Sequence, residues 1–285
     1  MTPRPVSPSL LAARNLAKAL LLLAALCAAA GAIGLAIGGV RTLSIFVFAA
    51  LLAGLTVALA GDRILLGMAG ARELPLGEAP LLHATVSSLA ARAGVVPPRL
   101  YLIPDGHPRA LAVGRGPASS AIAVSQGLLQ ACPAAELEGV LAHEIAHVRA
   151  RDVLTQTAAS ILAGAIYDTA RIGGFLAPTL RFVLGPVAAA FVHALLSPRR
   201  ELAADRLAAG WCGSPHGLAD ALVRLEQASA LVGFEGSPAT APLWTIDPFP
   251  PTGPSALFAS HPPVADRVAA LRALDPDWRD RLLGA

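Results

Sequence analysis

The sequence predicts a mainly α-helical protein with a small β-sheet (an α+β fold) that is attached to transmembrane helices. Three observations lead to this expectation: two long apolar stretches near the N-terminus, three short strand-like runs, and several stretches of helical periodicity. Of the 285 residues, 55% are hydrophobic and only 14% are charged, and the mean hydropathy is +0.61. Soluble domains carry roughly a quarter charged residues, so the composition indicates a membrane protein and excludes a disordered one.

Charge and cysteine content exclude further classes of protein. The formal net charge is +3 and the basic residues form no cluster, so we expect no nucleic-acid partner. Cys27, Cys132 and Cys212 are widely spaced and form no CxxC pair. This excludes a disulfide framework or a cysteine-rich zinc site and favours small thiols in a reducing compartment. No pattern in the sequence specifies an oligomeric state.

The first elements are expected to form a transmembrane hairpin over residues 19–61, after an N-terminal tail over 1–18. Residues 19–40 and 42–61 contain no charged residue, and each stretch is long enough to cross a bilayer. Only Arg41, closely preceded by a pair of glycines, separates them. The two stretches are therefore expected to be joined by a tight reversal.

The flanking charges predict how this hairpin is oriented. Positive residues lie on both sides of it, namely Arg4, Arg14, Lys18, Arg63 and Arg72. The positive-inside rule then places both ends in the cytoplasm, so residues 62–285 begin on the cytoplasmic side. A cleaved signal peptide and a buried core hairpin are the alternatives. The apolar run is longer than the core of a signal peptide needs.

The middle of the chain predicts a helix, a small sheet and a second, longer helix. Apolar residues recur at helical spacing over 78–94, and a glycine and two prolines follow. Strand-like runs then occur at 99–103, 111–113 and 121–125. The long helix is expected from Cys132 onwards, with Pro133 in its first turn.

The segment 153–196 is apolar but is interrupted by three charged residues. Its longest charge-free stretch has fifteen residues, which is short for a bilayer span. A second transmembrane hairpin is favoured, while a re-entrant hairpin and an amphipathic surface segment are alternatives. Amphipathic helices are expected at 217–232 and 263–274, on either side of an irregular loop rich in proline and glycine.

The long helix contains an HExxH motif, formed by residues 143–147. His143 and His147 are four residues apart, so both imidazoles share one helical face and can bind one zinc ion per chain. Glu144 lies beside that face, where it can accept a proton from a water molecule. The alternative is a surface helix that carries two histidines and a solvated glutamate and binds no metal. The apolar neighbours indicate a buried helix instead, in which a metal removes the cost of burying these groups.

The third metal ligand is expected downstream of this motif. The glycine and histidine that follow HExxH in metzincins are absent, and the one Asp-Gly pair precedes the motif rather than following it. Glu201 and Asp205 share one helical face. Glu201 can complete a His₂Glu site that leaves a position for water, while Asp205 can hold the N–H of a ligand histidine. An exposed ion pair with Arg199 or Arg200 is the alternative for Glu201.

A shared metal also constrains the membrane topology. His143 and Glu201 can bind the same ion only if they lie on the same side of the bilayer. The segment between them must therefore cross the membrane twice or not at all.

With these motifs the chain resembles the HtpX family of membrane-bound zinc metallopeptidases, which are relatives of the CAAX prenyl proteases. The resemblance rests on the hairpin, the apolar insertion, LAHEIAHVRARD (Leu141–Asp152), SPRRELAAD (Ser197–Asp205) and SHPPVADRVAAL (Ser260–Leu271). It implies a gluzincin-like fold at a bacterial inner membrane, with the active site facing the cytoplasm. It also implies a stress-related endopeptidase that degrades misfolded or damaged membrane proteins.

Two positions depart from that family. Arg109 stands where its members typically have asparagine, so no substrate contact is carried over to it. Pro198 stands where an arginine is usual, shortly before the third ligand.

In the expected mechanism Glu144 takes a proton from the attacking water and delivers it to the leaving amine. A donor to the tetrahedral oxyanion is also needed, and His261, Arg200 and His193 are the candidates. Asp152 is expected to brace the site. An unfolded substrate is expected to add as a strand at the sheet edge, around 111–113 or 121–125.

Two other functions compete with this interpretation. A membrane scaffold with a structural zinc would need a fourth ligand, such as His261 or Cys212, and would have no use for Glu144. A prenyl-protein protease is closer, but that class usually carries more membrane spans than this chain can hold.

Overall fold

The computed structural model describes residues 8–169, 174–175, 177–231, 243–246 and 260–277. It is mainly helical and contains a small mixed sheet, as the sequence predicts. The helices are α1 (Pro8–Met68), α2 (Pro80–Ala93), α3 (Gln126–Ala131), α4 (Ala134–Ala150), α5 (Val153–Thr169), α6 (Ala177–Leu195), α7 (Pro198–Cys212), α8 (His216–Leu231) and α9 (Val264–Arg272). The strands are β1 (Arg72–Glu73), β2 (Arg99–Ile103), β3 (Ala110–Gly114) and β4 (Ser120–Ser125). Most of the loop expected at 233–262 lies outside the described residues.

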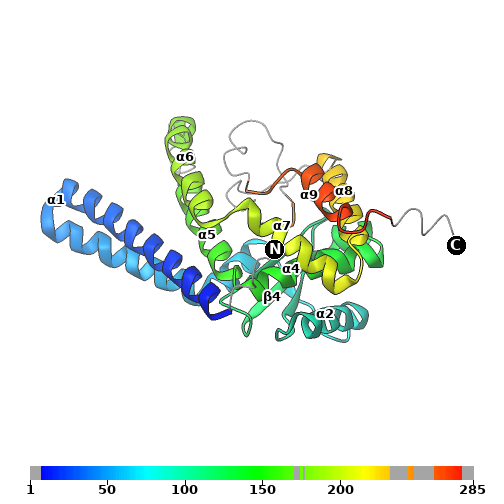
Figure 1. Cartoon of the computed structure of the whole chain (residues 1–285). Coiled ribbons are helices and arrows are strands. Elements are labelled where there is room, and N and C mark those ends of the chain that lie inside the picture. The colour runs from blue at the N-terminus through cyan, green and yellow to red at the C-terminus, as the bar shows by residue number, and fades with distance from the viewer. Residues whose placement is uncertain (1–7, 170–173, 176, 232–242, 247–259, 278–285) are drawn as a thin grey trace, which may run out of the picture.

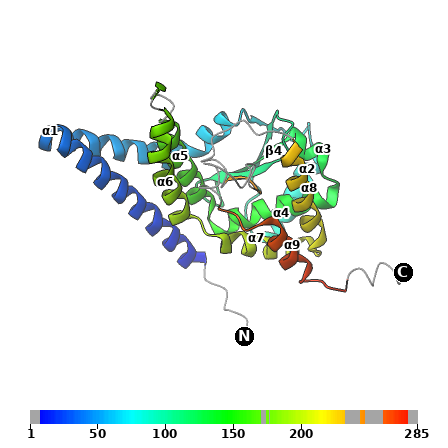
Figure 2. The ribbon, with the colours of Figure 1, turned by 90° about the horizontal axis from the view of Figure 1, so that it is seen from above.

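The N-terminal helix α1 folds back on itself and projects from the rest of the molecule (Figures 1 and 2). The reversal occurs at Gly38 and Gly39, whose backbone is not helical; Gly39 has a φ of 71°, which favours glycine. The two arms pack closely, because a Cβ on Gly54 would come within 2.5 Å of Leu23. Among the described residues, α1 is the one helix long and apolar enough to cross a membrane, with a mean hydropathy of 2.6. Large apolar side chains such as Phe48 are exposed on it.

The sheet has the strand order β1-β2-β4-β3. β2 and β4 are parallel, while β1 and β3 pair antiparallel with their neighbours. β4 therefore has a strand on each side and is buried on both faces. The expectation that 121–125 could be an edge was wrong, because a later strand-like run in sequence need not lie at the rim of the sheet. Among the described strands, β3 is the edge strand next to β4.

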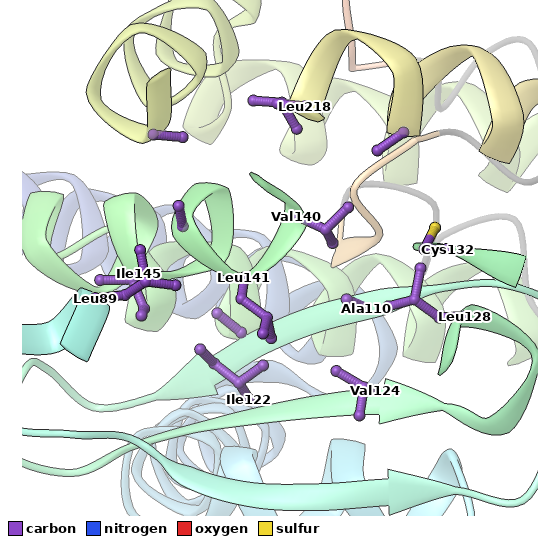
Figure 3. Packing of buried hydrophobic residues seen from close by; sticks show 14 of the residues in the cluster. Leu89, Ala110, Ile122, Val124, Leu128, Cys132, Val140, Leu141, Ile145 and Leu218 are labelled. Atoms are coloured by element: carbon purple, nitrogen blue, oxygen red, sulfur yellow. The ribbon is translucent and has the colours of Figure 1, made fainter. Parts of the chain in front are cut away.

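Each face of the sheet has its own apolar cluster. On one face Ile122 and Val124 pack against Leu141 of α4, and Leu218 of α8 lies beyond that helix (Figure 3). α4 and α8 approach closely because Gly139 has no side chain; a Cβ there would come within 2.7 Å of the backbone of Leu218. α4 is thus held between the sheet and α8. On the other face, Leu65 and Leu66 at the end of α1 pack against β3 and β4.

The apolar segment 153–196 forms two helices, α5 and α6, which lie side by side (Figures 1 and 2). They pack through small residues, among them Ala159 and Ala163 of α5 and Ala188 of α6. α5 also approaches the end of α1, where a Cβ on Gly61 would come within 2.9 Å of Thr157. The chain therefore leaves α4 and returns to α7 through a pair of helices.

Candidate metal centre

The metal-ligating side chains come from α4 and α7. His143 and His147 lie one turn apart on α4, with their Nε2 atoms 3.2 Å apart and their rings nearly perpendicular. Glu201 lies in the first turn of α7. Its Oε2 is 3.4 Å from Nε2 of His143, and its Oε1 is 3.6 Å from Nε2 of His147. One ligand atom from each of the three residues lies within 4.8 Å of the others.

This donor set fits a tetrahedral metal ion. Ligand atoms about 2.0–2.1 Å from a tetrahedral zinc are about 3.3 Å apart, close to the observed separations of 3.2–3.6 Å. Two imidazoles with one carboxylate form the ligand set of a catalytic zinc, which keeps a further position open.

The local charge also calls for a cation. Four carboxylates and two guanidinium groups are buried or nearly buried here: Glu144, Asp152, Glu201, Asp205, Arg200 and Arg267. Burial lowers the pKa of His147, but Glu201 and Asp152 outweigh this effect and raise it to about 10. Burial also disfavours the charged form of Glu201, yet His147 and His261 hold its pKa well below the usual range. Carboxylates that draw protons onto imidazoles would be neutralised by a divalent ion.

Asp205, one turn after Glu201 on α7, contacts the far side of His143. Its Oδ1 is 2.9 Å from Nδ1 of His143, so the imidazole can present its Nε2 to a metal. The guanidinium of Arg267, from α9, donates two hydrogen bonds to Asp205, of 2.8 and 2.7 Å. Burial opposes ionisation of Asp205, but the Arg267 guanidinium lowers its pKa to about 2. Asp205 therefore stays charged and fixes the orientation of the ring.

Asp152 lies beside His147, as Asp205 lies beside His143. α4 ends at Ala150, Arg151 takes a left-handed conformation, and the N–H of Asp152 donates to the carbonyl of His147. This turn places Oδ2 of Asp152 3.8 Å from Nδ1 of His147, longer than a hydrogen bond. Arg200 donates a 2.8 Å bond to the same oxygen. Arg200 therefore pairs with Asp152.

Glu144 is buried next to the metal-ligating histidines. Its Oε1 accepts a 2.8 Å hydrogen bond from the hydroxyl of Thr245. Thr245 lies between α8 and α9 in sequence, and its carbonyl accepts a 2.7 Å bond from Arg267.

The other candidate site residues, His261, His193 and Cys212, lie in different parts of the structure. The side chain of His261 is buried at the site, with its Nε2 3.5 Å from Oε2 of Glu201. Burial lowers the pKa of His261 to about 4, so its imidazole is neutral. His193 is exposed near the end of α6. Cys212 ends α7, eleven residues after Glu201 and so about 16 Å along the helix; its thiol contacts the carbonyl of Glu138.

Sequence reasoning missed Arg267 and Thr245. A signal for Arg267 exists, because Val264, Val268 and Leu271 mark the apolar face of α9 and Arg267 falls on that face. A charged residue on a core-facing stripe predicts a buried partner. We find no comparable signal for Thr245, which the fold brings to Glu144 across about a hundred residues of sequence.

An HExxH helix, a glutamate from a second helix and a buried glutamate beside them together define the class of metal-dependent peptidases. The sequence profile of peptidase family M48 matches residues 77–275. The chain belongs to this family.

Two individual relatives agree with this assignment. A "Protease HtpX homolog" of Pelotomaculum thermopropionicum is 38% identical over 91% of this chain and 99% of its own length. Another, of Acidiphilium cryptum, is 43% identical over 90% and 96%. The crystal structure of S. mikatae Ste24p matches with a TM-score of 0.46 at 20% identity, over 92% of this chain and 66% of that chain. The predicted resemblance to the HtpX metallopeptidases is confirmed.

Proposed function

We propose that the protein is a membrane-anchored zinc endopeptidase that hydrolyses peptide bonds of misfolded or damaged membrane proteins. The observation that carries this proposal is the convergence of His143, His147 and Glu201 next to the buried carboxylate of Glu144. Membership of peptidase family M48 supports the reaction class. The long apolar surface of α1 supports the attachment to a bilayer.

His143, His147 and Glu201 would hold one zinc ion, in a gluzincin-type arrangement. When bound, zinc polarises the scissile carbonyl and acidifies water. Glu144 accepts the proton of the attacking water and passes it to the leaving amine. Asp205 holds His143 in the tautomer with a free Nε2, and Asp152, charged and bonded to Arg200, braces the side of His147.

The oxyanion needs a donor, and His261 is the best placed of the three candidates. Its neutral imidazole lies beside Glu201, whereas Arg200 is engaged with Asp152 and His193 is exposed. His261 would donate an N–H to the developing charge.

In the cell we propose a bacterial inner-membrane protein that spans the bilayer several times, with the active site facing the cytoplasm. Residues 1–18 would form a cytoplasmic tail, 19–61 a transmembrane hairpin and 62–285 the peptidase domain. Within that domain, 153–196 would form a second hairpin. The pairing of α5 with α6 is compatible with two crossings and keeps His143 and Glu201 on one side.

The competing functions gain no support. A structural zinc scaffold would leave the burial of Glu144 beside the histidines without a purpose. A prenyl-protein protease would share the site, but no feature of the described residues favours a prenyl group.

Metal removal tests the proposal. Treating the detergent-solubilised protein with a chelator should abolish cleavage of unfolded casein, because the ligand set then lacks its ion. Adding zinc back to the metal-free protein should restore cleavage. Cleavage that persists after complete removal of the metal would refute a zinc-dependent reaction.

A further inference from the structure

The segment Leu243–Ile246 contacts the proposed active site through Thr245. Its four residues are at most 6% exposed. Leu243 and Trp244 belong to the apolar cluster on the α1 side of the sheet, whereas Ile246 belongs to the cluster on the α4 side. The segment therefore passes from one face of the sheet to the other, and Thr245 lies at the crossing.

Two hydrogen bonds attach Thr245 to the site itself. Its hydroxyl donates to Oε1 of Glu144 at 2.8 Å, and its carbonyl accepts from the buried guanidinium of Arg267 at 2.7 Å. The first bond occupies an oxygen that the proposed reaction uses to accept a proton. Thr245 therefore takes one of the acceptor positions of this carboxylate.

Trp244 anchors the segment at the start of β3. The guanidinium carbon of Arg109 lies 4.4 Å from the centre of the Trp244 ring, a distance typical of a cation–π contact. Arg109 directly precedes β3 and is itself paired with Asp105. This contact thus attaches the segment to the sheet.

The site is closed in this arrangement. His143, Glu144, His147 and Glu201 are at most 5% exposed, so a polypeptide backbone cannot approach them. Of the elements around the site, α4 and α7 carry the ligands, and α9 is fixed by the bond between Arg267 and Asp205. Leu243–Ile246 carries no ligand, and among the described residues between α8 and α9 it is the part that contacts Glu144.

We propose that Leu243–Ile246 is an autoinhibitory plug that caps Glu144, and that an extended, unfolded polypeptide displaces it. This inference rests on the proposed function, because it assumes that Glu144 faces a peptide substrate. It predicts an enzyme that is latent at rest. The apparent substrate affinity is then lowered by the fraction of molecules in which the plug is open.

A binding experiment tests the plug without requiring turnover. The background is zinc-loaded Glu144→Gln in detergent, which keeps an acceptor oxygen for Thr245, and the probe is fluorescein-labelled unfolded casein. Trp244→Ala should lower Kd by about tenfold, because it removes the cation–π contact that holds the segment against β3. Thr245→Val keeps the shape but removes the donor, and it should lower Kd by about threefold.

Trp211→Ala is the matched control. Trp211 also stacks on an arginine, Arg149, at 5.6 Å, but it lies near the far end of α7 from Glu201. Its Kd should stay within twofold of the background.

The outcomes separate the plug from the proposed function. Unchanged or weaker binding by Trp244→Ala and Thr245→Val, or no binding by any variant, would overturn the plug. If Trp244→Ala does not retain zinc, Thr245→Val decides alone. Failure of the protein with Glu144 intact to cleave casein would count against the proposed function, and the binding result would still decide the plug.

Discussion

At the scale of single residues, the site is organised by charge. Asp205 and Asp152 contact the two histidines from the side away from Glu201, and each carboxylate has its own arginine. Removing Asp205 would free the ring of His143 to turn and would take from the buried Arg267 its carboxylate partner. The ligands are therefore held in place before any metal binds.

Replacing Asp205 tests this arrangement. Asp205→Asn should cost about 3–5 kcal/mol of stability, because Arg267 is left buried without its partner. It should also weaken zinc binding by about 10–100-fold. Asp220→Asn is the control, since its ion pair with Arg272 is about half exposed, and exposed pairs contribute less than about 1 kcal/mol. Thermal denaturation and zinc competition titrations check both effects; equal results for the two variants would contradict the assignment.

The lowered pKa of Asp205 predicts how the stability of the protein depends on pH. The folded protein lowers the pKa of Asp205 to about 2, below its ordinary value of about 3.9. The stabilisation by Asp205 is therefore complete above about pH 4 and is lost as the pH falls towards 2.

The residues of the site differ in how far sequence could predict them. His143, Glu144 and His147 lie within about one helical turn, so their spacing alone predicts a shared face for the two histidines, with Glu144 beside it. Glu201 and Asp205 needed an argument by ligand count, because the distance between α4 and α7 is set by the fold. Thr245 reaches Glu144 through tertiary packing only.

At the scale of elements, periodicity predicted α2, α8, α9 and the central strands to within a few residues. It did not predict β1 or α3, which have two and six residues, because such short elements carry no period. It also did not decide between 111–113 and 121–125 as the edge of the sheet, and only the first of these is an edge strand. Strand order depends on the crossover between β2 and β4, and no local pattern records that crossover.

The observed edge gives a sharper test of substrate binding by strand addition. Hydrogen bonds join residue 109 to 125 and residue 115 to 119, so the alternation of an antiparallel ladder directs the N–H of Ala112 away from β4. Ala112→Pro removes this donor and keeps the ladder. It should raise KM for unfolded casein by up to about tenfold, with little change in kcat. Ala112→Val, which adds bulk but keeps the N–H, is the control; an equal rise in both variants would argue against strand addition.

At the scale of the whole molecule, the helical hairpins determine where the site can lie. The α1 hairpin and the α5–α6 pair lie on the same side of the molecule (Figure 1). α1 ends on the sheet through Leu65 and Leu66, so the proposed membrane anchor is joined directly to the layer next to the metal centre. This placement suits substrates that emerge from a bilayer.

Cysteine labelling tests the proposed orientation. In a variant whose three native cysteines are alanine, Arg41→Cys at the tip of the hairpin should react with an impermeant thiol reagent in intact bacterial cells. Glu226→Cys, exposed on α8, should react only after the cells are permeabilised. The opposite pattern would reverse the orientation, and equal labelling of both would place both on one side.

The most direct test of the central claim, that a metal centre with Glu144 as its base hydrolyses peptide bonds, is the rate of casein cleavage by zinc-loaded protein. Glu144→Gln should keep its zinc and lose at least about 100-fold in kcat. Glu138→Gln, on the same helix in a partly exposed ion pair with Arg92, should retain the unaltered rate. Cleavage by Glu144→Gln at that same rate would contradict the claim.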